Sequence, residues 1–302
     1  MLKIPSDAIL EIKGKTKNGF VIPGDEKTIY FNFKDSQTVN DKGEIDEGGN
    51  VVGGEEIPGI GVANFVLSTY FFKLFEECLD IPTHMIESDI DNGVMQVKRA
   101  KLYGQDHLIP KLHLPGKRLG ETLTDVKSGG LEVINRRKFT GSYVREFDDF
   151  YDMMPIDSNH PSFVEFTIKN DEVGDPRISR SQLVAEGILT DEQIAQIVDE
   201  SQRIENLVQR LAKANNFEVI DFKTEHGITN DLEHLLVDEY GTGACRLKYS
   251  DDVMVKSPKP FDKVEAFLGA DIANDIQNMH LKGLNDKVKR ATEEAMSLVL
   301  KR

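Results

Sequence analysis

The strongest constraint on the fold is a stretch with charged and apolar residues in strict alternation, Asp221-Phe222-Lys223-Thr224-Glu225-His226-Gly227. Side chains of an extended strand point alternately to its two faces. The charged residues therefore share one face, and the apolar face takes the residues Ile220, Phe222 and Thr224. The alternation predicts a strand with one polar and one apolar side.

This strand is predicted to form half of a hairpin. Residues 228–231 contain Asn and Asp and are turn-like, and 232–238 indicate a returning strand. The polar face would then gather Asp221, Glu225 and Asp238 around one lysine. Two like charges about 4 Å apart repel by about 4 kcal/mol at an effective dielectric constant of about 20. Such a face favours a cation, and oxygen ligands suit Mg²⁺ held together with a phosphate.

Length and charge limit the classes of protein that fit. A chain of 302 residues can bury a large core in one domain or two lobes. Its net charge of −15 argues against general nucleic-acid binding and against adsorption to anionic membranes. We find no apolar leader and no run of about 18 apolar residues, so no membrane span is expected. Cys78 and Cys245 lie far apart, which predicts no disulfide framework and fits a cytoplasmic protein.

The order of the elements indicates an α+β fold. Strands are expected at 10–12, 20–22, 28–33, 95–100, 131–135 and 163–169, and helices at 62–79, from the capping box at Thr190 onward, and at 285–301. Residues 43–61 are rich in glycine and predict a loop. We divide the chain into a strand-rich lobe at 1–101, an insertion loop at 102–130 and a second lobe at 131–302.

Two motifs could bind phosphate. Gly14-Lys15-Thr16-Lys17 lies between two predicted strands and could fold over a triphosphate through backbone N–H and ammonium groups. It is not a Walker sequence, and a solvated turn remains the alternative. The stretch 136–145 combines several arginines with Gly141-Ser142 and suits a phosphate monoester, with a basic surface loop as its alternative. The seven histidines show no metal-ligand spacing, so a zinc site is not expected.

Taken together and in order, these segments resemble the SAICAR synthetase family. The matching segments are Gly14-Lys15-Thr16-Lys17, Lys34-Asp35, Pro82-Thr83-His84, Arg136 with Gly141-Ser142, Lys169 to Pro176, Asp221 to Gly227, and Asp238-Glu239 with Arg246. The resemblance implies a two-lobed fold, kinase-like or ATP-grasp-like, with ATP between the lobes. It also implies a ligase of purine biosynthesis that joins carboxyaminoimidazole ribotide (CAIR) to L-aspartate with ATP and Mg²⁺. No nucleic-acid or membrane partner is expected, and a homodimer is a possible assembly.

The chemistry implied by the resemblance needs an activated acid. A carboxylate is a poor electrophile, so its phosphorylation to an acyl phosphate provides a good leaving group for attack by the amine. Catalysis then consists of positioning and charge neutralisation. By the same resemblance Asp221 and Lys223 line the reacting centre, and Glu225 and Asp238 bind Mg²⁺. The ATP-binding residues would be Gly14, Lys15, Thr16, Lys17, Lys98 and Lys169, and the substrate-binding residues Arg136, Ser142, Arg145 and Arg246.

The chain departs from the family pattern at two places. Gly59-Ile60-Gly61 stands where many members have Gly-Lys-Gly, and Gly241-Thr242-Gly243 stands where many have Ser-Pro-Asp. The second hypothesis is therefore a related ATP-dependent amide ligase with a different amine or carboxylate. The third hypothesis is a non-catalytic nucleotide-binding homologue. Retention of the polar residues along 221–246 argues against the third.

Overall fold

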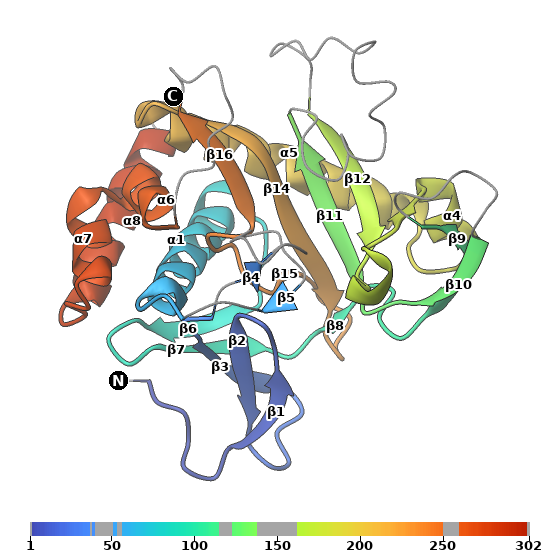
Figure 1. Cartoon of the computed structure of the whole chain (residues 1–302), viewed down its shortest axis with the longest axis horizontal. Coiled ribbons are helices and arrows are strands. Elements are labelled where there is room, and N and C mark those ends of the chain that lie inside the picture. The colour runs from blue at the N-terminus through green and yellow to red at the C-terminus, as the bar shows by residue number, and fades with distance from the viewer. Residues whose placement is uncertain are drawn as a thin grey trace.

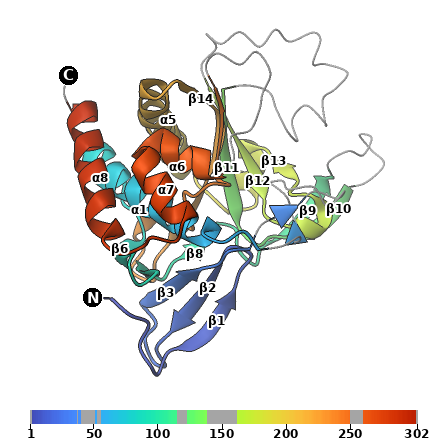
Figure 2. The same ribbon diagram turned by 60° about the vertical axis from the view of Figure 1, so that its left-hand side comes forward.

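The computed structural model describes residues 2–36, 38–39, 51–52, 56–114, 123–137, 162–249 and 260–300. Within these ranges two larger antiparallel sheets are joined by a group of helices (Figures 1 and 2). The predicted α+β fold class is therefore confirmed. No helix in the described ranges is long and apolar enough to cross a membrane.

The first sheet is built almost entirely from the N-terminal third of the chain. Its five strands lie in the order β1-β2-β3-β7-β6. Their bounds are β1 Ile9–Lys13, β2 Lys17–Val21, β3 Thr28–Phe33, β6 Met85–Asp89 and β7 Val94–Lys98. β2 begins at Lys17, three residues earlier than the sequence predicts, so the last residue of the Gly-Lys-Thr-Lys motif belongs to a strand.

The second sheet is organised around one long strand, β14 Phe217–Ile228. Its strands run in the order β13-β12-β11-β14-β15, and β16 and β8 also pair with β14. The bounds are β8 Lys101–Leu102, β11 Leu131–Arg136, β12 Phe163–Ile168, β13 Arg177–Ile178, β15 His234–Val237 and β16 Cys245–Tyr249. β14 pairs antiparallel with β15, so the predicted hairpin is confirmed.

The helices are α1 Ile60–Leu79, α4 Arg180–Ala185, α5 Asp191–Ala214, α6 Pro260–Leu268, α7 Ala270–Gln277 and α8 Leu284–Leu300, with a 3₁₀ turn η1 at Asp171–Val173. α1, α6, α7 and α8 pack together as one group, α5 packs on β14 and β11, and α4 lies beside β12 (Figures 1 and 2). Thr190 caps α5, since Thr190 Oγ1 accepts from the backbone N–H of Gln193 and the Gln193 side chain accepts from the N–H of Thr190. This capping box is the one that the sequence predicts.

Two hydrophobic clusters stabilise the fold, and neither follows the predicted lobes. The larger one joins the first sheet to α1, α5, β14, β16 and the C-terminal helices. The smaller one runs through β11, β12 and the start of α5, and includes Ile109, Leu112 and Val126. These three residues belong to the hairpin of β9 Leu108–His113 and β10 Leu123–Lys127.

The prediction of a loop over 102–130 is therefore wrong for the β9–β10 hairpin, which is anchored by buried apolar side chains. Its alternation is hidden in the sequence by Gly, Pro and Lys residues. The short strand β5 Val51–Val52 also lies within the segment 43–61, where a loop was expected, and it pairs with β4 Thr38–Val39. Lobe boundaries near 101 and 131 stay a prediction. Cys78 and Cys245 are free thiols, as the sequence predicts.

Candidate functional site

The turn between β1 and β2 brings the Gly-Lys-Thr-Lys motif against the second sheet. The Gly14 N–H donates to the Lys17 carbonyl at 3.0 Å. A Cβ on Gly14 would lie 2.8 Å from that oxygen, so only glycine fits this close approach. Lys34 Nζ donates to the Gly14 carbonyl at 2.5 Å. The turn is held tightly, and the two lysines of the motif point to different partners.

Lys17 points into the protein. Its Nζ lies 2.5 Å from Asp238 Oδ1 and 2.9 Å from Glu239 Oε2, and its side chain is only 9% exposed. Thr16 Oγ1 donates to the same Glu239 oxygen at 3.0 Å. Burial acts to lower the pKa of Lys17, but the carboxylates of Asp238 and Glu239 outweigh it and raise that pKa above its ordinary value. Lys17 is a buried cation that fixes Asp238 and Glu239.

Asp238 directly follows β15, in a left-handed backbone conformation with φ of 71°. Asp tolerates this conformation better than most residues, but it is rarely populated, and such strain is concentrated at functional positions. Burial acts to raise the pKa of Asp238, and the ammonium groups of Lys17, Lys169 and Lys223 overcome it and hold that pKa well below its usual range. Asp238 is therefore ionised at neutral pH.

Glu225 lies beside Asp238 across the hairpin, since it pairs with Val237. Its Oε1 is 2.6 Å from Lys169 Nζ and 3.6 Å from Lys223 Nζ. Burial and the neighbouring Asp238 carboxylate raise the pKa of Glu225. Two neighbouring carboxylates repel each other when both are ionised, and a bound cation would offset that repulsion.

Glu132 completes the group from the neighbouring strand β11. Its Oε1 accepts from Lys223 at 2.6 Å, and its Oε2 accepts from Thr167 at 3.1 Å. Burial acts to raise the pKa of Glu132, but the Lys223 ammonium outweighs it and lowers that pKa. We call the whole group the lysine–carboxylate cluster; it consists of Lys17, Lys169, Lys223, Glu132, Glu225, Asp238 and Glu239.

The expectation of three acids around one lysine is wrong in two respects. The cluster holds three lysines, and Asp221 is not in it. Successive strand residues rise by about 3.3 Å, so residues four apart, such as Asp221 and Glu225, lie about 13 Å apart along β14. They share a face of the strand without sharing a site.

Asp221 belongs instead to a ladder of charges that crosses five strands. Arg177 Nε lies 2.8 Å from Glu165 Oε2, and Arg136 Nη2 lies 2.6 Å from Glu165 Oε1. Arg136 Nη1 lies 3.0 Å from Asp221 Oδ2, and Arg246 Nε lies 2.7 Å from Asp221 Oδ1. The strands involved are β13, β12, β11, β14 and β16. Positive and negative groups alternate along this charge ladder, so each carboxylate contacts two arginines.

The two predicted substrate-binding arginines of the ladder differ in access. The Arg136 side chain is 2% exposed, whereas that of Arg246 is 39% exposed. The structure therefore places Arg136 inside the protein between two carboxylates, where it can position Asp221. Arg246 is the partner of Asp221 that solvent and small molecules can reach. The other two predicted substrate contacts, Ser142 and Arg145, lie outside the described residues.

The other lysines predicted to contact ATP, Lys15, Lys98 and Lys169, lie in different places and have different partners. Lys15 Nζ lies 2.6 Å from Asp171 Oδ2, and both side chains are substantially exposed. Lys169 is in the lysine–carboxylate cluster, close in sequence to Asp171. Lys98 is not, because its Nζ pairs with Glu233 at 2.7 Å at the end of β7. Its backbone N–H donates to the His84 carbonyl.

Sequence reasoning missed Glu132, Glu165 and Glu239 as members of these groups. Glu239 was visible beside Asp238. Glu132 and Glu165 lie on strands that the sequence predicts. Their placement follows only once strand pairing is known, because Glu132 pairs with Glu225 and Arg136 with Asp221.

The second departure from the family pattern, the loop 241–243, docks on α1, the helix that begins at the first departure. Asn64 of α1 accepts from the backbone N–H of Thr242 at 2.8 Å and from its hydroxyl at 2.7 Å. A Cβ on Gly241 would lie 2.6 Å from Asn64 Oδ1. Ile60, at the start of α1, is buried. The loop 241–243 is thus docked on α1 through contacts that a Ser-Pro-Asp sequence would have to make differently.

Solved structures share this fold. A SAICAR synthetase in complex with ADP covers 95% of the chain and 97% of its own length, with a TM-score of 0.58 and 22% identity. The SAICAR-synthase from Saccharomyces cerevisiae in complex with SAICAR covers 100% of the chain and 98% of its own length, with a TM-score of 0.59 and 18% identity. At these identities the likeness establishes the fold, which is the one that the sequence resemblance implies.

The sequence comparisons establish the family. The model of the SAICAR synthetase family matches residues 10–278. A phosphoribosylaminoimidazole-succinocarboxamide synthase from Clostridium tetani is 31% identical over 235 residues, which are 78% of this chain and 89% of the relative. One from Methanopyrus kandleri is 27% identical over 237 residues, 78% of this chain and 79% of the relative. The chain belongs to the SAICAR synthetase family.

Proposed function

We propose that this protein is an ATP- and Mg²⁺-dependent ligase that joins CAIR to L-aspartate and forms SAICAR. The observation that supports this most directly is the lysine–carboxylate cluster beside the Gly14–Lys17 turn. It combines ammonium groups that suit phosphate oxygens with carboxylates that suit a divalent cation. Family membership and the relatives named as synthases support the same substrates.

The donor set fits Mg²⁺. Glu225 and Asp238 offer hard oxygen ligands, and their mutual repulsion is balanced by Lys17, Lys169 and Lys223. The Asp238 side chain is 27% exposed, so it can be reached from outside. When bound, the cation would supply charge neutralisation for the phosphate groups of the nucleotide. We assign its protein ligands to Glu225 and Asp238.

The chain's own residues would do the rest. Lys15 is exposed and can leave Asp171 for a phosphate oxygen, because an exposed ion pair is worth only about 0–1 kcal/mol. Lys223 belongs to the cluster and is two residues along β14 from Asp221 of the charge ladder, and it would stabilise negative charge that develops on the activated carboxylate. Arg246, held by Asp221, would bind the ribotide. Each of these roles uses a positioned charge and needs no covalent intermediate on the protein.

A second candidate is an amide ligase of the same family with a different amine. The docked loop at 241–243 and the buried Ile60 favour it, because they replace a lysine and an aspartate of the family pattern. A non-catalytic nucleotide-binding homologue is the third candidate. A protein without catalytic activity would not need the seven charged residues of the lysine–carboxylate cluster, which argues against this candidate.

The test is a turnover assay with ATP, Mg²⁺, CAIR and L-aspartate that measures both ADP and SAICAR. Glu225→Gln and Asp238→Asn should lower the rate by at least about 100-fold, the scale of a lost electrostatic contact in a transition state. Glu87→Gln, an exposed carboxylate on β6, is the matched control and should keep the wild-type rate.

Circular dichroism should show that both cluster variants remain folded. Wild-type rates in these variants would show that Glu225 and Asp238 are not the cation ligands. Turnover with a different acid or amine, and none with CAIR and L-aspartate, would select the second candidate. Binding of Mg²⁺-ATP in calorimetry without turnover for any substrate pair would select the third.

A further inference from the structure

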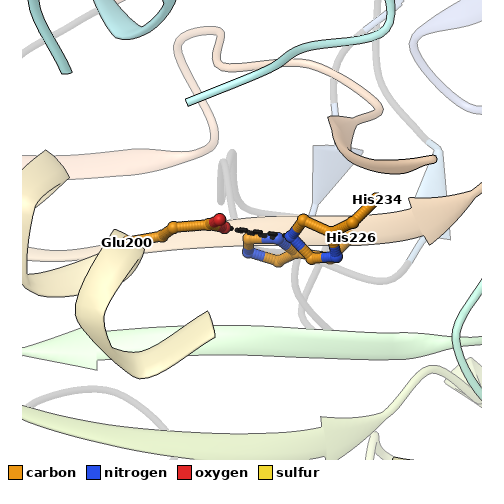
Figure 3. A group of neighbouring side chains, drawn as sticks. All are labelled: Glu200, His226 and His234. Carbon is orange, nitrogen blue, oxygen red and sulfur yellow. Dashed lines mark hydrogen bonds and ion pairs between the residues drawn. The ribbon is translucent and has the colours of Figure 1, made fainter. Parts of the chain in front are cut away.

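A second group of candidate metal ligands lies on the other face of β14. His226 of β14, His234 of β15 and Glu200 of α5 meet there (Figure 3). His226 follows Glu225 directly, so the two side chains point to opposite faces of the strand. The side chains of Glu200 and His226 are almost fully buried, and that of His234 is 14% exposed. This group is therefore separated from the lysine–carboxylate cluster by the backbone of β14.

The three side chains converge on one point. His234 Nε2 lies 3.0 Å from Glu200 Oε2, and His226 Nδ1 lies 3.5 Å from the same oxygen. One ligand atom from each residue lies within 4.8 Å of the others. The two imidazole rings are stacked, with centroids 5.3 Å apart. Zinc binds nitrogen and oxygen ligands at about 2 Å, so a bound ion would draw the most widely separated of these atoms closer together.

The environment of His226 Nδ1 indicates that a cation can bind here. This nitrogen is buried and makes no hydrogen bond within the part of the chain that the structure describes. A buried polar atom left unsatisfied costs about 1–3 kcal/mol, and native proteins contain few of them. Here His226 Nδ1 lies 3.5 Å from Glu200 Oε2, the oxygen that His234 Nε2 also contacts at 3.0 Å (Figure 3). A cation at that point would satisfy it.

The outward-facing atoms of all three residues are already held. His226 Nε2 lies 3.2 Å from Thr224 Oγ1, and His234 Nδ1 lies 3.1 Å from the Tyr103 hydroxyl. Gln196 Nε2 donates to Glu200 Oε1 at 2.9 Å. In metal sites the second nitrogen of a ligating histidine usually donates to such a partner, which fixes the ring and leaves the inner lone pair for the metal. These hydrogen bonds therefore hold the three side chains in orientations that suit metal binding.

We propose that Glu200, His226 and His234 bind one divalent transition-metal ion, with Zn²⁺ as the best match, and a water molecule as the fourth ligand. Two imidazoles and one carboxylate are an established zinc ligand set, and imidazole ligands disfavour Mg²⁺ and Ca²⁺. The ion would tie α5 to the β14–β15 hairpin. Because the site lies on the face of β14 opposite the lysine–carboxylate cluster, we assign the ion the role of supporting the hairpin, whichever substrates the ligase uses.

This proposal departs from the expectation that no zinc site forms, which was based on the spacing of the histidines in the sequence. His226 and His234 are eight residues apart, which matches no short zinc motif. They come together because the β14–β15 hairpin returns the chain, and Glu200 is supplied by α5.

The test uses the full chain stripped of metal with a chelator and then titrated with Zn²⁺ in competition with a chromophoric chelator. The wild type should bind one equivalent. Glu200→Gln and His226→Asn should each weaken binding at least about 100-fold, and Tyr103→Phe, which removes only an outer partner, by about 10–100-fold. His280→Gln, an exposed histidine between α7 and α8, is the matched control and should bind as the wild type does.

Cobalt substitution gives a second readout that does not depend on activity. Co²⁺ at this site should show the visible absorption of a four-coordinate ion with nitrogen and oxygen ligands, and no thiolate charge-transfer band. No zinc binding by the folded wild type, unchanged binding in both ligand variants, or a thiolate band that indicates Cys78 or Cys245 would each overturn the proposal. If His226→Asn fails to fold, Glu200→Gln and Tyr103→Phe still decide the outcome.

Discussion

The two lysines of the Gly14–Lys17 turn offer the sharpest test of how the site is built. Lys17 is buried against Asp238 and Glu239, whereas Lys15 is exposed and pairs with the equally exposed Asp171. Substitution by methionine keeps the approximate length and the apolar stem of the side chain. At these two positions it should therefore affect different properties of the protein. Lys17→Met should chiefly lower stability, and Lys15→Met should chiefly affect the nucleotide.

The magnitudes follow from burial. Removing one partner of a buried ion pair costs about 3–5 kcal/mol, because the other charge is left uncompensated. We expect about 3 kcal/mol for Lys17→Met, since the Asp238 side chain remains 27% exposed and can be partly solvated. For 302 residues this loss corresponds to a melting temperature lower by about 5 °C. Lys15→Met should change stability by less than about 1 kcal/mol.

Urea unfolding at neutral pH without nucleotide measures the stability of both variants, with an unchanged dependence on urea as the check that the unfolded state is the same. A double-mutant cycle isolates the contact itself. In the Asp238→Asn background, Lys17→Met should cost less than it does alone, because one of its two carboxylates is gone. Steady-state kinetics should show a raised KM for ATP in Lys15→Met.

Two results would refute this account of the turn. Equal stabilities for Lys17→Met and the wild type would mean that the Lys17 ammonium does not hold Asp238 and Glu239 in solution. Additive effects of Lys17→Met and Asp238→Asn would mean that the two residues do not interact, whatever their distance. Either result would also remove the contribution of Lys17 to the low pKa of Asp238, and Lys169 and Lys223 alone would have to account for it.

Three further predictions concern other parts of the molecule. Arg136→Ala should cost about 3–5 kcal/mol in a urea titration, because its guanidinium is buried, whereas Arg246→Ala should leave stability nearly unchanged and raise the KM for CAIR more than that for ATP. Burial, and after it the Lys17 ammonium, lower the pKa of His84 to about 3. The unfolded chain takes up this proton near pH 6.5, so stability should fall as the pH drops from about 6.5 toward about 3, by up to about 1.4 kcal/mol per pH unit, and His84→Gln should remove that part of the slope. Gly241→Ala should lower stability by about 1–3 kcal/mol in thermal unfolding, because the new methyl group collides with Asn64; an unchanged melting temperature would show that the loop moves freely.

Local patterns predicted the elements whose geometry is set by neighbours in the sequence. The alternation along 221–225 identified the strand and its two faces, and Thr190 and Gln193 identified the start of α5. The β9–β10 hairpin escaped prediction because its burial depends on contacts with β13 and the second hydrophobic cluster. Sequence periodicity cannot report such contacts.

For the candidate site, the residue types were predictable and their partners were not. Glu225 and Asp238 were expected to meet, and they do interact. Asp221 was expected with them, but strand geometry carries it to Arg136 and Arg246. The convergence of Glu200, His226 and His234 depends on where α5 crosses β14, which is a property of tertiary packing alone.

The pairing of β14 has a consequence for how this family member can change over time. Asp221, Lys223 and Glu225 face charged groups, and Phe222, Thr224 and His226 lie on the opposite face of the strand. One irregularity in register, between Val219 and Asp221, is already present. Adding or deleting a single residue would exchange the two environments for everything beyond that point. Lys223 would then turn toward apolar packing and Phe222 toward the charged groups. The number of residues in this segment should therefore be inherited more strictly than their identities.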